Sequence, residues 1–332
     1  MMRLLCLLVL TILFLQSCNR RNEECAFVPD TDAIPVDLVV EHLEDSIAGF
    51  TSKQQLVDFF SRHPVMRDNF FSRSAYPSDS MFINELYNRF TNPYFDSLLL
   101  ETHKKFGDFS EIKNEFQQAF KNFTYYYPGF LPPKVQTVIS GLETDLFVSD
   151  SLIIIGLDYY MGPGAKYRPN MHEYILRRYQ KNFIVPSVLL LYGIGDRYNA
   201  SNLEDRTVLA EMITYGKAYY FAKQMLPCVP DSVFIGYTRE EIEGSRNNLD
   251  LIWKRFIEDE VLYATTHLVK QKYIGERPKT IEVGEKCPGR IGTWVGWEIV
   301  KKYMDNSEVT LPQLMQTAEG KEIFARSKFR PL

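Results

Sequence analysis

The sequence predicts a mostly helical α+β fold, with a small antiparallel sheet packed on a long central helix. Apolar residues at helical spacing cover most of the chain, and three short apolar runs between residues 134 and 157 have the pattern of strands. Hydrophobic residues make up 45% and charged residues 24% of the 332 residues, which excludes a disordered or collagen-like chain. A formal net charge of -4, without a long basic run, argues against a nucleic-acid partner.

Residues 1–17 have the pattern of a bacterial lipoprotein signal peptide. One charge, at Arg3, precedes an apolar run from residue 4 to residue 15 that is too short for a membrane span. The segment Leu15-Gln16-Ser17-Cys18 resembles a lipobox, in which the cysteine thiol is lipidated after cleavage. An ordinary secretory signal with a chance cysteine is the alternative. We expect a lipid on Cys18 to attach the protein to a membrane, because each buried methylene adds about 0.8 kcal/mol.

Residues 18–37 are predicted to be the lipidated cysteine and a polar, proline-containing tether. Asn19 follows the cysteine without an acidic cluster. By resemblance to known sorting rules, this favours the periplasmic face of the outer membrane within the cell envelope. Glu23-Glu24 hints at export to the cell surface, so the choice of leaflet stays open.

Three cysteines remain once Cys6 is removed and Cys18 is lipidated: Cys25, Cys228 and Cys287. An oxidising compartment permits one pair of them to form a disulfide and leaves an odd thiol. The alternative is that all three are small buried residues. The sequence does not choose among these pairings.

Residues 38–332 are expected to form one α+β domain whose first part, 38–130, is helical. A short strand is predicted at 39–43, and the capping-box pattern Thr51-Ser52-Lys53-Gln54 opens a helix. The inward-facing residues of this helix are Leu56, Phe59 and Phe60. Further helices are predicted at 81–89, 94–106 and 110–123.

The second part of the domain, 131–332, begins with strands and continues as helices. Strands are predicted at 134–139, 145–148 and 152–157. Helices are predicted at 172–181, 185–191, 201–226, 238–268 and 288–304, followed by a short one that Thr310-Leu311-Pro312-Gln313 opens. Ser201-Asn202-Leu203-Glu204 and Thr238-Arg239-Glu240-Glu241 have capping-box patterns, and Pro288 suits the first turn of a helix.

Three stretches together are similar to one known family. They are Gly156-Leu157-Asp158-Tyr159-Tyr160-Met161-Gly162 with the strand before it, Met212-Ile213-Thr214-Tyr215-Gly216-Lys217, and residues 288–300. With the lipobox, they resemble the gliding-motility lipoprotein B family (GldB) over most of the chain from about Val39. The resemblance implies a cell-envelope lipoprotein connected with gliding motility.

That family is in turn similar to predicted zinc proteases, whose long helix carries His-Glu-x-x-His. Here Ala210-Glu211-Met212-Ile213-Thr214 stands at that place, so both histidines are missing. Zinc catalysis needs two imidazoles four residues apart and a third ligand, and no two histidines lie closer in sequence than His42 and His63. We therefore expect a zincin-like scaffold at 131–332 with no metal, no cofactor and no catalytic residue, in which Glu211 is a vestigial candidate.

A cleft beside that helix is the candidate binding site. Gly289, Gly292 and Gly296 share one helical face, and each costs about 1 kcal/mol relative to alanine. Close approach of a neighbouring helix would offset this cost, or the face forms the floor of a cleft. The candidate cleft residues are Asp158, Tyr159, Tyr160, Glu211, Thr214, Tyr215, Trp294 and Trp297.

Five Asp-Ser pairs precede an apolar residue and resemble O-glycosylation acceptors of envelope proteins. Turns and helix caps are the alternative, because Asp and Ser favour both. The acceptor residues would be Ser46, Ser80, Ser97, Ser151 and Ser232.

Three hypotheses for function follow from these observations. The first is a non-catalytic lipoprotein that supports the gliding or secretion machinery through contacts with other envelope proteins. The second is a metallopeptidase-like hydrolase with a degenerate site around Glu211, helped by Asp158 or Glu243. The third is a peptide-binding or glycan-binding lipoprotein that uses the same cleft.

Overall fold

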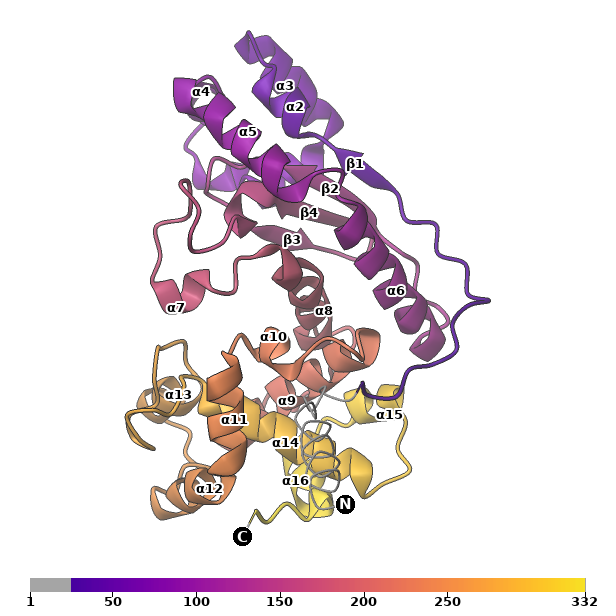
Figure 1. The fold of residues 1–332 in the computed structure, drawn as a ribbon, viewed down its shortest axis with the longest axis vertical. Helices are drawn as coiled ribbons and strands as arrows, with labels where there is room; N and C mark the ends of the chain where they lie inside the picture. Colours follow the sequence, from indigo (N-terminus) through magenta and orange to yellow (C-terminus); the bar gives the residue numbers. More distant parts are fainter. Residues whose placement is uncertain (1–24, 332) are drawn as a thin grey trace, which may run out of the picture.

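The computed structural model describes residues 25–331, so the predicted signal peptide and Cys18 lie outside the described residues. The protein is 55% helical and carries one open four-stranded sheet, which confirms the predicted mostly helical α+β fold. Figure 1 shows the sheet between an upper group of helices and a lower group that includes the C-terminal ones.

The helices between the first and second strands of the sheet are α2 (Glu44–Ala48), α3 (Lys53–Arg62), α4 (Asp79–Phe90), α5 (Pro93–Phe106) and α6 (Ser110–Tyr126). The 3-10 helix η3 (Leu157–Tyr160) ends the last strand. It is followed by α7 (Glu173–Leu176), α8 (Ile184–Ile194), α9 (Val208–Met225), α10 (Asp231–Ile235), α11 (Arg239–Asn247) and α12 (Leu249–Glu258). The chain ends with α13 (His267–Tyr273), α14 (Ile291–Asp305), α15 (Leu311–Gln316) and α16 (Gly320–Ser327).

The sheet is mixed, so the prediction of an antiparallel sheet is wrong. Its strand order is β1-β2-β4-β3, formed by β1 (Val40–His42), β2 (Lys134–Val138), β4 (Leu152–Gly156) and β3 (Leu146–Val148). The pairs β1–β2 and β2–β4 are parallel, and only β3, at the edge, runs antiparallel to β4. The physical reason is the connection between β1 and β2. It contains α2 to α6, and a crossover of this length carries the chain back to the end of the sheet where β1 began. β2 therefore runs in the same direction as β1.

Each face of the sheet is covered by its own group of helices. Val138 and Ile154 face a cluster made by α2 to α5, whereas Val135, Ile153 and Ile155 face the main cluster with α6 and α8. Helix α8 contacts both β3 and α9, and it stands between the sheet and α9 (Figure 1). The sheet therefore packs on α8, not on the long central helix α9 as predicted.

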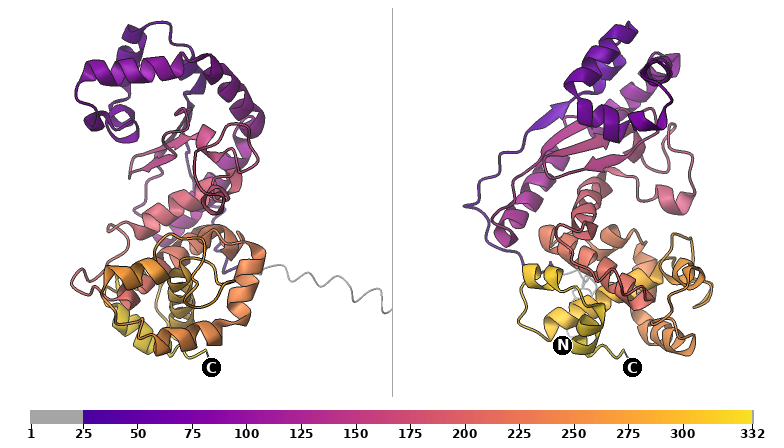
Figure 2. Two further views of the ribbon diagram at one scale, coloured as in Figure 1. Left: turned by 90° about the vertical axis from the view of Figure 1, so that its left-hand side faces the viewer. Right: turned by 180° about the vertical axis from the view of Figure 1, so that it is seen from behind.

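Helix α9 is nevertheless the centre of the lower group, which Figure 2 shows from two further sides. It contacts α6, α8, α10, α14, α15 and α16. Its crossing with α14 is so close that a Cβ atom on Gly296 would lie 1.9 Å from the Met212 carbonyl oxygen, and one on Gly216 would lie 2.4 Å from the Gly296 carbonyl oxygen. The predicted close helix approach is thereby confirmed.

Several predicted helix boundaries need correction. Helix α9 begins at Val208, where Thr207 caps the Ala210 N–H, and the Asn202 side chain accepts from the Glu204 N–H in the preceding turn. The predicted helix 238–268 is divided at Asn248 into α11 and α12, and an irregular segment precedes α13. Gly289 precedes α14.

Some predicted caps and helix starts are confirmed and others are wrong. The capping boxes at Thr238 and Thr310 are confirmed. Pro288 forms an isolated bridge with Lys279 instead of entering α14, and α7 begins at Glu173, with His172 at its N-cap. The sequence pattern did not predict α16.

The N-terminal segment is fixed to the body. Cys25 forms a disulfide with Cys228, just after α9, and the Ala26 N–H donates to the Pro227 carbonyl oxygen at 3.0 Å. Thr31 is buried, and Gln118 on α6 donates to its hydroxyl at 3.4 Å. The described part of the predicted tether is therefore a strap that runs along the body. In residues 25–331 Cys287 is the free cysteine.

A buried lysine ties the C-terminal segment to α9. The Lys217 Nζ donates to the carbonyl oxygens of Ala200 at 2.6 Å, Met315 at 3.3 Å and Thr317 at 2.8 Å. An ammonium group satisfies three carbonyls at once, so these segments meet without leaving buried acceptors unpaired.

We predict that Gly296→Ala destabilises the protein by about 2 kcal/mol or more, because the added methyl group has to push α9 and α14 apart. The matched control is Gly244→Ala on α11, where a Cβ atom meets nothing within 4 Å. This change should raise stability by about 0.5–1 kcal/mol, since alanine favours a helix over glycine. Urea unfolding followed by circular dichroism measures both. Equal effects would contradict the close crossing.

Candidate functional site

A cavity of ≈ 400 Å³ lies where the edge of the sheet meets α8, α9 and α10; we call it the junction cavity. Its floor is one face of α8, which supplies Ser187, Leu190, Leu191 and Ile194 at helical spacing. Leu191 is 46% exposed and Ile194 42% exposed, so the apolar floor continues to the surface. The volume falls in the range of about 300–1,000 Å³ that small-ligand pockets have.

Aromatic side chains form two walls of the junction cavity. On the sheet side, the rings of Tyr160 and Tyr179 lie 5.4 Å apart, and the Tyr179 hydroxyl donates to Asp145 Oδ2 at 3.0 Å. On the helix side, Tyr215 and Tyr219 project from α9. Burial raises the pKa of Tyr160 and of Tyr179 well above the usual value. Both phenols therefore stay neutral at physiological pH.

Two arginines complete the lining. Arg178, which follows α7, and Arg290, the N-cap of α14, both reach the carboxylate of Glu276, at 2.7 Å and 3.5 Å. Arg290 also donates to the Ile235 carbonyl oxygen at 2.5 Å. Burial opposes the charge of Arg290, but the phenol oxygens of Tyr219 and Tyr237 together with Glu276 raise its pKa, so it remains a cation.

The structure brings only part of the predicted cleft together. Tyr160 and Tyr215 line the junction cavity, and Tyr159 lies next to it, with its ring 5.0 Å from that of Tyr179. Trp294 and Trp297 are fully buried, so neither lines an open cleft. Their side chains fill the core beside the α9–α14 crossing.

Glu211 and Thr214 lie on α9 outside the lining of the cavity. Glu211 is half exposed and forms an ion pair with Lys270 on α13. The Thr214 hydroxyl donates to the Ala210 carbonyl oxygen of its own helix at 2.9 Å. The ion pair joins α9 to α13, and neither Glu211 nor Thr214 reaches the junction cavity.

Asp158 organises the turn after β2. Its fully buried carboxylate accepts from the Ser140 N–H at 2.9 Å and from the Leu142 N–H at 2.6 Å. The Ser140 hydroxyl in turn accepts from the Glu143 N–H at 3.1 Å. Burial raises the pKa of Asp158 to about 6, although these N–H donors oppose the shift. The residue thus supports the fold next to the sheet.

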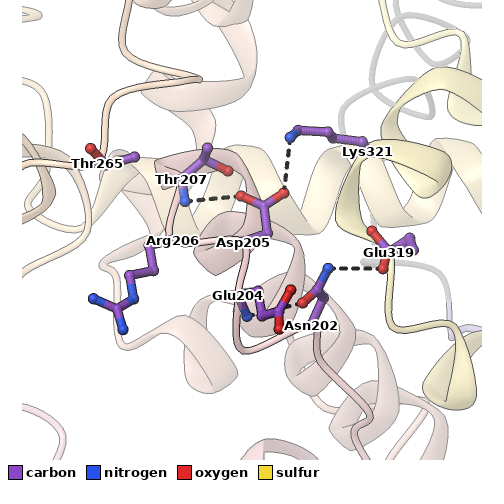
Figure 3. Close-up of a pocket in the computed structure, with 8 residues that line it drawn as sticks. All are labelled: Asn202, Glu204, Asp205, Arg206, Thr207, Thr265, Glu319 and Lys321. Carbon is purple, nitrogen blue, oxygen red and sulfur yellow. Dashed lines mark hydrogen bonds and ion pairs between the residues drawn. The ribbon is translucent and has the colours of Figure 1, made fainter.

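A second pocket, of ≈ 520 Å³, lies at the N-terminus of α9 and is polar (Figure 3). Asp205 accepts from the Thr207 N–H at 3.1 Å and pairs with Lys321 at 3.3 Å, while Asn202 donates to Glu319 at 2.9 Å. These polar groups are bound to one another, as the dashed lines show. We interpret this pocket as the cap of α9 and its attachment to the C-terminal segment.

The residues present do not fit a catalytic zinc ion. Within the described range 25–331, no group of three or more His, Cys, Asp or Glu side chains is arranged to hold a metal. Asp145 is the one member of these residue types in the lining of the junction cavity, and it is bound to Tyr179.

The five predicted glycosylation acceptors differ in setting. Ser151 is exposed in the turn between β3 and β4, whereas the others lie in helices α2, α4, α5 and α10. Ser46 and Ser80 are also exposed, and Ser97 and Ser232 are half-buried. Glycosylation at these residues stays a prediction.

Comparison with protein families decides the identity of the chain. The family model described as "Gliding motility protein GldB" matches residues 24–331. The chain belongs to the GldB family. Comparisons with curated proteins and with solved structures find no match. GldB membership supports a gliding-motility lipoprotein of the cell envelope. Among the helices of residues 25–331, none has both the length and the apolar character needed to cross a membrane.

Sequence reasoning missed the charged half of the GldB junction cavity. Arg178, Glu276 and Arg290 come from three distant segments, and none of them forms a motif on its own. Arg290 lies inside the stretch 288–300 that carries the family resemblance, which was the one available signal.

We predict that Asp158→Asn costs about 1–3 kcal/mol of stability at neutral pH, because the amide leaves one buried N–H donor without an acceptor. Asp305→Asn, an exposed change at the end of α14, should stay within about 0.5 kcal/mol of the wild type. Urea midpoints compare the two. If Asp158→Asn loses no more stability than Asp305→Asn, the role of Asp158 in organising the turn is contradicted.

The same pair of proteins tests the raised pKa of Asp158. The folded value of about 6 exceeds the unfolded value of about 3.9, so the folded state binds a proton more readily. The resulting stability is fully present below the unfolded value and is lost as pH rises through about 6. When the pH is lowered from about 7 to about 5, the free energy of unfolding of the wild type should therefore rise by about 1 kcal/mol relative to that of Asp158→Asn. Parallel unfolding curves at both pH values measure this difference.

Proposed function

We propose that the protein is a non-catalytic, lipid-anchored lipoprotein on the periplasmic face of the outer membrane. In this proposal it supports the gliding or envelope secretion machinery through contacts with other envelope proteins. Family membership and the lipobox at Cys18 support the setting. The observation that carries the non-catalytic role is the lining of the junction cavity. Its arginine, tyrosine and aliphatic side chains are suited to binding, and its one carboxylate is already paired.

Two other functions remain as alternatives. A metallopeptidase-like hydrolase around Glu211 would need that carboxylate free and next to a cavity, whereas it pairs with Lys270 and lies outside the lining. Nor do Asp158 and Glu243 support it: Asp158 is buried in its turn, and Glu243 pairs with Arg239 on the exposed face of α11. A peptide-binding or glycan-binding lipoprotein is favoured by the aromatic walls and the arginines of the junction cavity.

We predict that Cys18→Ser moves the protein from the membrane fraction to the soluble periplasmic fraction, because the acceptor thiol for the lipid is lost. Cys287→Ser changes the free cysteine of the described chain and should leave the protein in the membrane fraction. Fractionation with immunoblotting and an intact-mass measurement compare the two variants. Full retention of Cys18→Ser on membranes would contradict lipid anchoring.

Chemical crosslinking in intact cells, followed by affinity capture of the lipidated protein, tests the role in protein contacts. We expect components of the gliding or secretion machinery to be captured with the wild type and to be lost with Cys18→Ser. Metal analysis of the purified protein is the second readout. Stoichiometric, tightly bound zinc together with peptidase activity that a chelator removes would overturn the non-catalytic role.

A further inference from the structure

The cation side of the junction cavity carries an excess of positive charge. Arg178 and Arg290 share one carboxylate, Glu276, and the Arg290 side chain is only 15% exposed. The one carboxylate in the lining, Asp145, lies on the sheet side and accepts from the Tyr179 hydroxyl and the Leu146 N–H. A partly buried guanidinium without a carboxylate of its own is costly, so an added anion would be stabilised here.

The backbone is shaped to hold both arginines in place. Gly236, at the end of α10, has a φ of +72°, and a Cβ atom there would lie 2.3 Å from Arg178 Cδ and 3.5 Å from Arg290 Nη2. A glycine at this point lets the two side chains lie over the helix end.

The opposite half of the lining is apolar. Leu190, Leu191 and Ile194 of α8 form its floor, and the rings of Tyr215 and Tyr219 stand beside them. A ligand that fits both halves has an anionic group at one end and an apolar or aromatic body at the other. A planar guanidinium group binds a carboxylate well, because two parallel N–H donors match its two oxygens.

We propose that the junction cavity binds a carboxylate attached to an apolar or aromatic body, with Arg178 and Arg290 holding the carboxylate. Two sources have this chemistry: the C-terminal residue of a polypeptide and a free small acid. The inference rests on the proposed binding role of the protein and specifies the chemistry that its cavity recognises.

The test uses two probes and their neutral analogues. The probes are N-acetylphenylalanine and an acetylated pentapeptide that ends in phenylalanine with a free carboxylate; the analogues are the corresponding amides. Isothermal titration calorimetry of the mature protein should give at least about tenfold weaker binding for each amide, since the charged hydrogen bonds are lost. Tighter binding of the peptide assigns the site to a polypeptide C-terminus, whereas equal binding assigns it to small acids.

Adjacent arginines provide a matched pair of variants. Arg178→Gln removes a guanidinium from the lining and should weaken carboxylate binding about tenfold. Arg177→Gln changes a residue of similar exposure, which pairs with Glu241 and does not line the cavity, so binding should be unchanged. Unfolding curves confirm that both variants are folded.

The proposal is overturned if acid and amide bind equally, if no probe binds at millimolar concentration, or if the two variants weaken binding alike. These outcomes are distinguishable from failure of the proposed function. Loss of crosslinked partners with intact carboxylate binding would overturn the protein-contact role alone. Loss of carboxylate binding with the crosslinked partners retained would overturn the ligand proposal and leave the protein-contact role intact.

Discussion

The close crossing of α9 and α14 is the constraint on which the lower half of the molecule depends. Gly216 and Gly296 meet at the crossing, and the Met212 carbonyl oxygen occupies the space where a Cβ atom on Gly296 would stand. Glycine is unfavourable inside helices, so the gain comes from backbone packing that larger residues would prevent. With the two backbones in contact, Trp294 and Trp297 are fully enclosed among the surrounding helices.

The same crossing fixes the walls of the junction cavity. Tyr215 and Tyr219 flank Gly216 along α9, so their position follows from the depth at which α9 meets α14. Arg290 stands at the start of α14 with a positive φ of 58°, which directs its side chain toward α10 and Glu276. The binding groups thus come from elements whose relative placement is set in the core. This is how a cavity between distant segments keeps a defined shape.

Local patterns were enough to predict much of the fold. The N-caps at Thr238 and Thr310 have the expected hydrogen bonds, because a cap depends on residues within one turn, whereas the cap predicted at Thr51 lies one residue later, at Ser52. Strand pairing was not predicted, because it depends on segments that many helices separate. A signal was present in Ile153–Ile155, which are all fully buried. An uninterrupted apolar run is typical of a central strand in a parallel sheet.

Prediction of the candidate site was limited in the same way. Tyr160 and Tyr215 were found through the family stretches that contain them, whereas Arg178 and Glu276 belong to no pattern and become neighbours only in the folded chain. Trp294 was misplaced for a different reason. Spacing shows which residues share a helical face, but α14 is enclosed on most sides, so no face of its central part remains open.

The disulfide between Cys25 and Cys228 decides how the molecule would bear mechanical load. With the anchor proposed at Cys18, only residues 19–24 separate the membrane from this covalent link, a reach of about 20–25 Å when fully extended. Tension on the anchor would pass through the sulfur atoms into the end of α9, the helix at the centre of the lower group. The strap and β1, which follow Cys25 in the chain, would be spared. A protein built this way resists being peeled from its attachment end when the envelope around it moves.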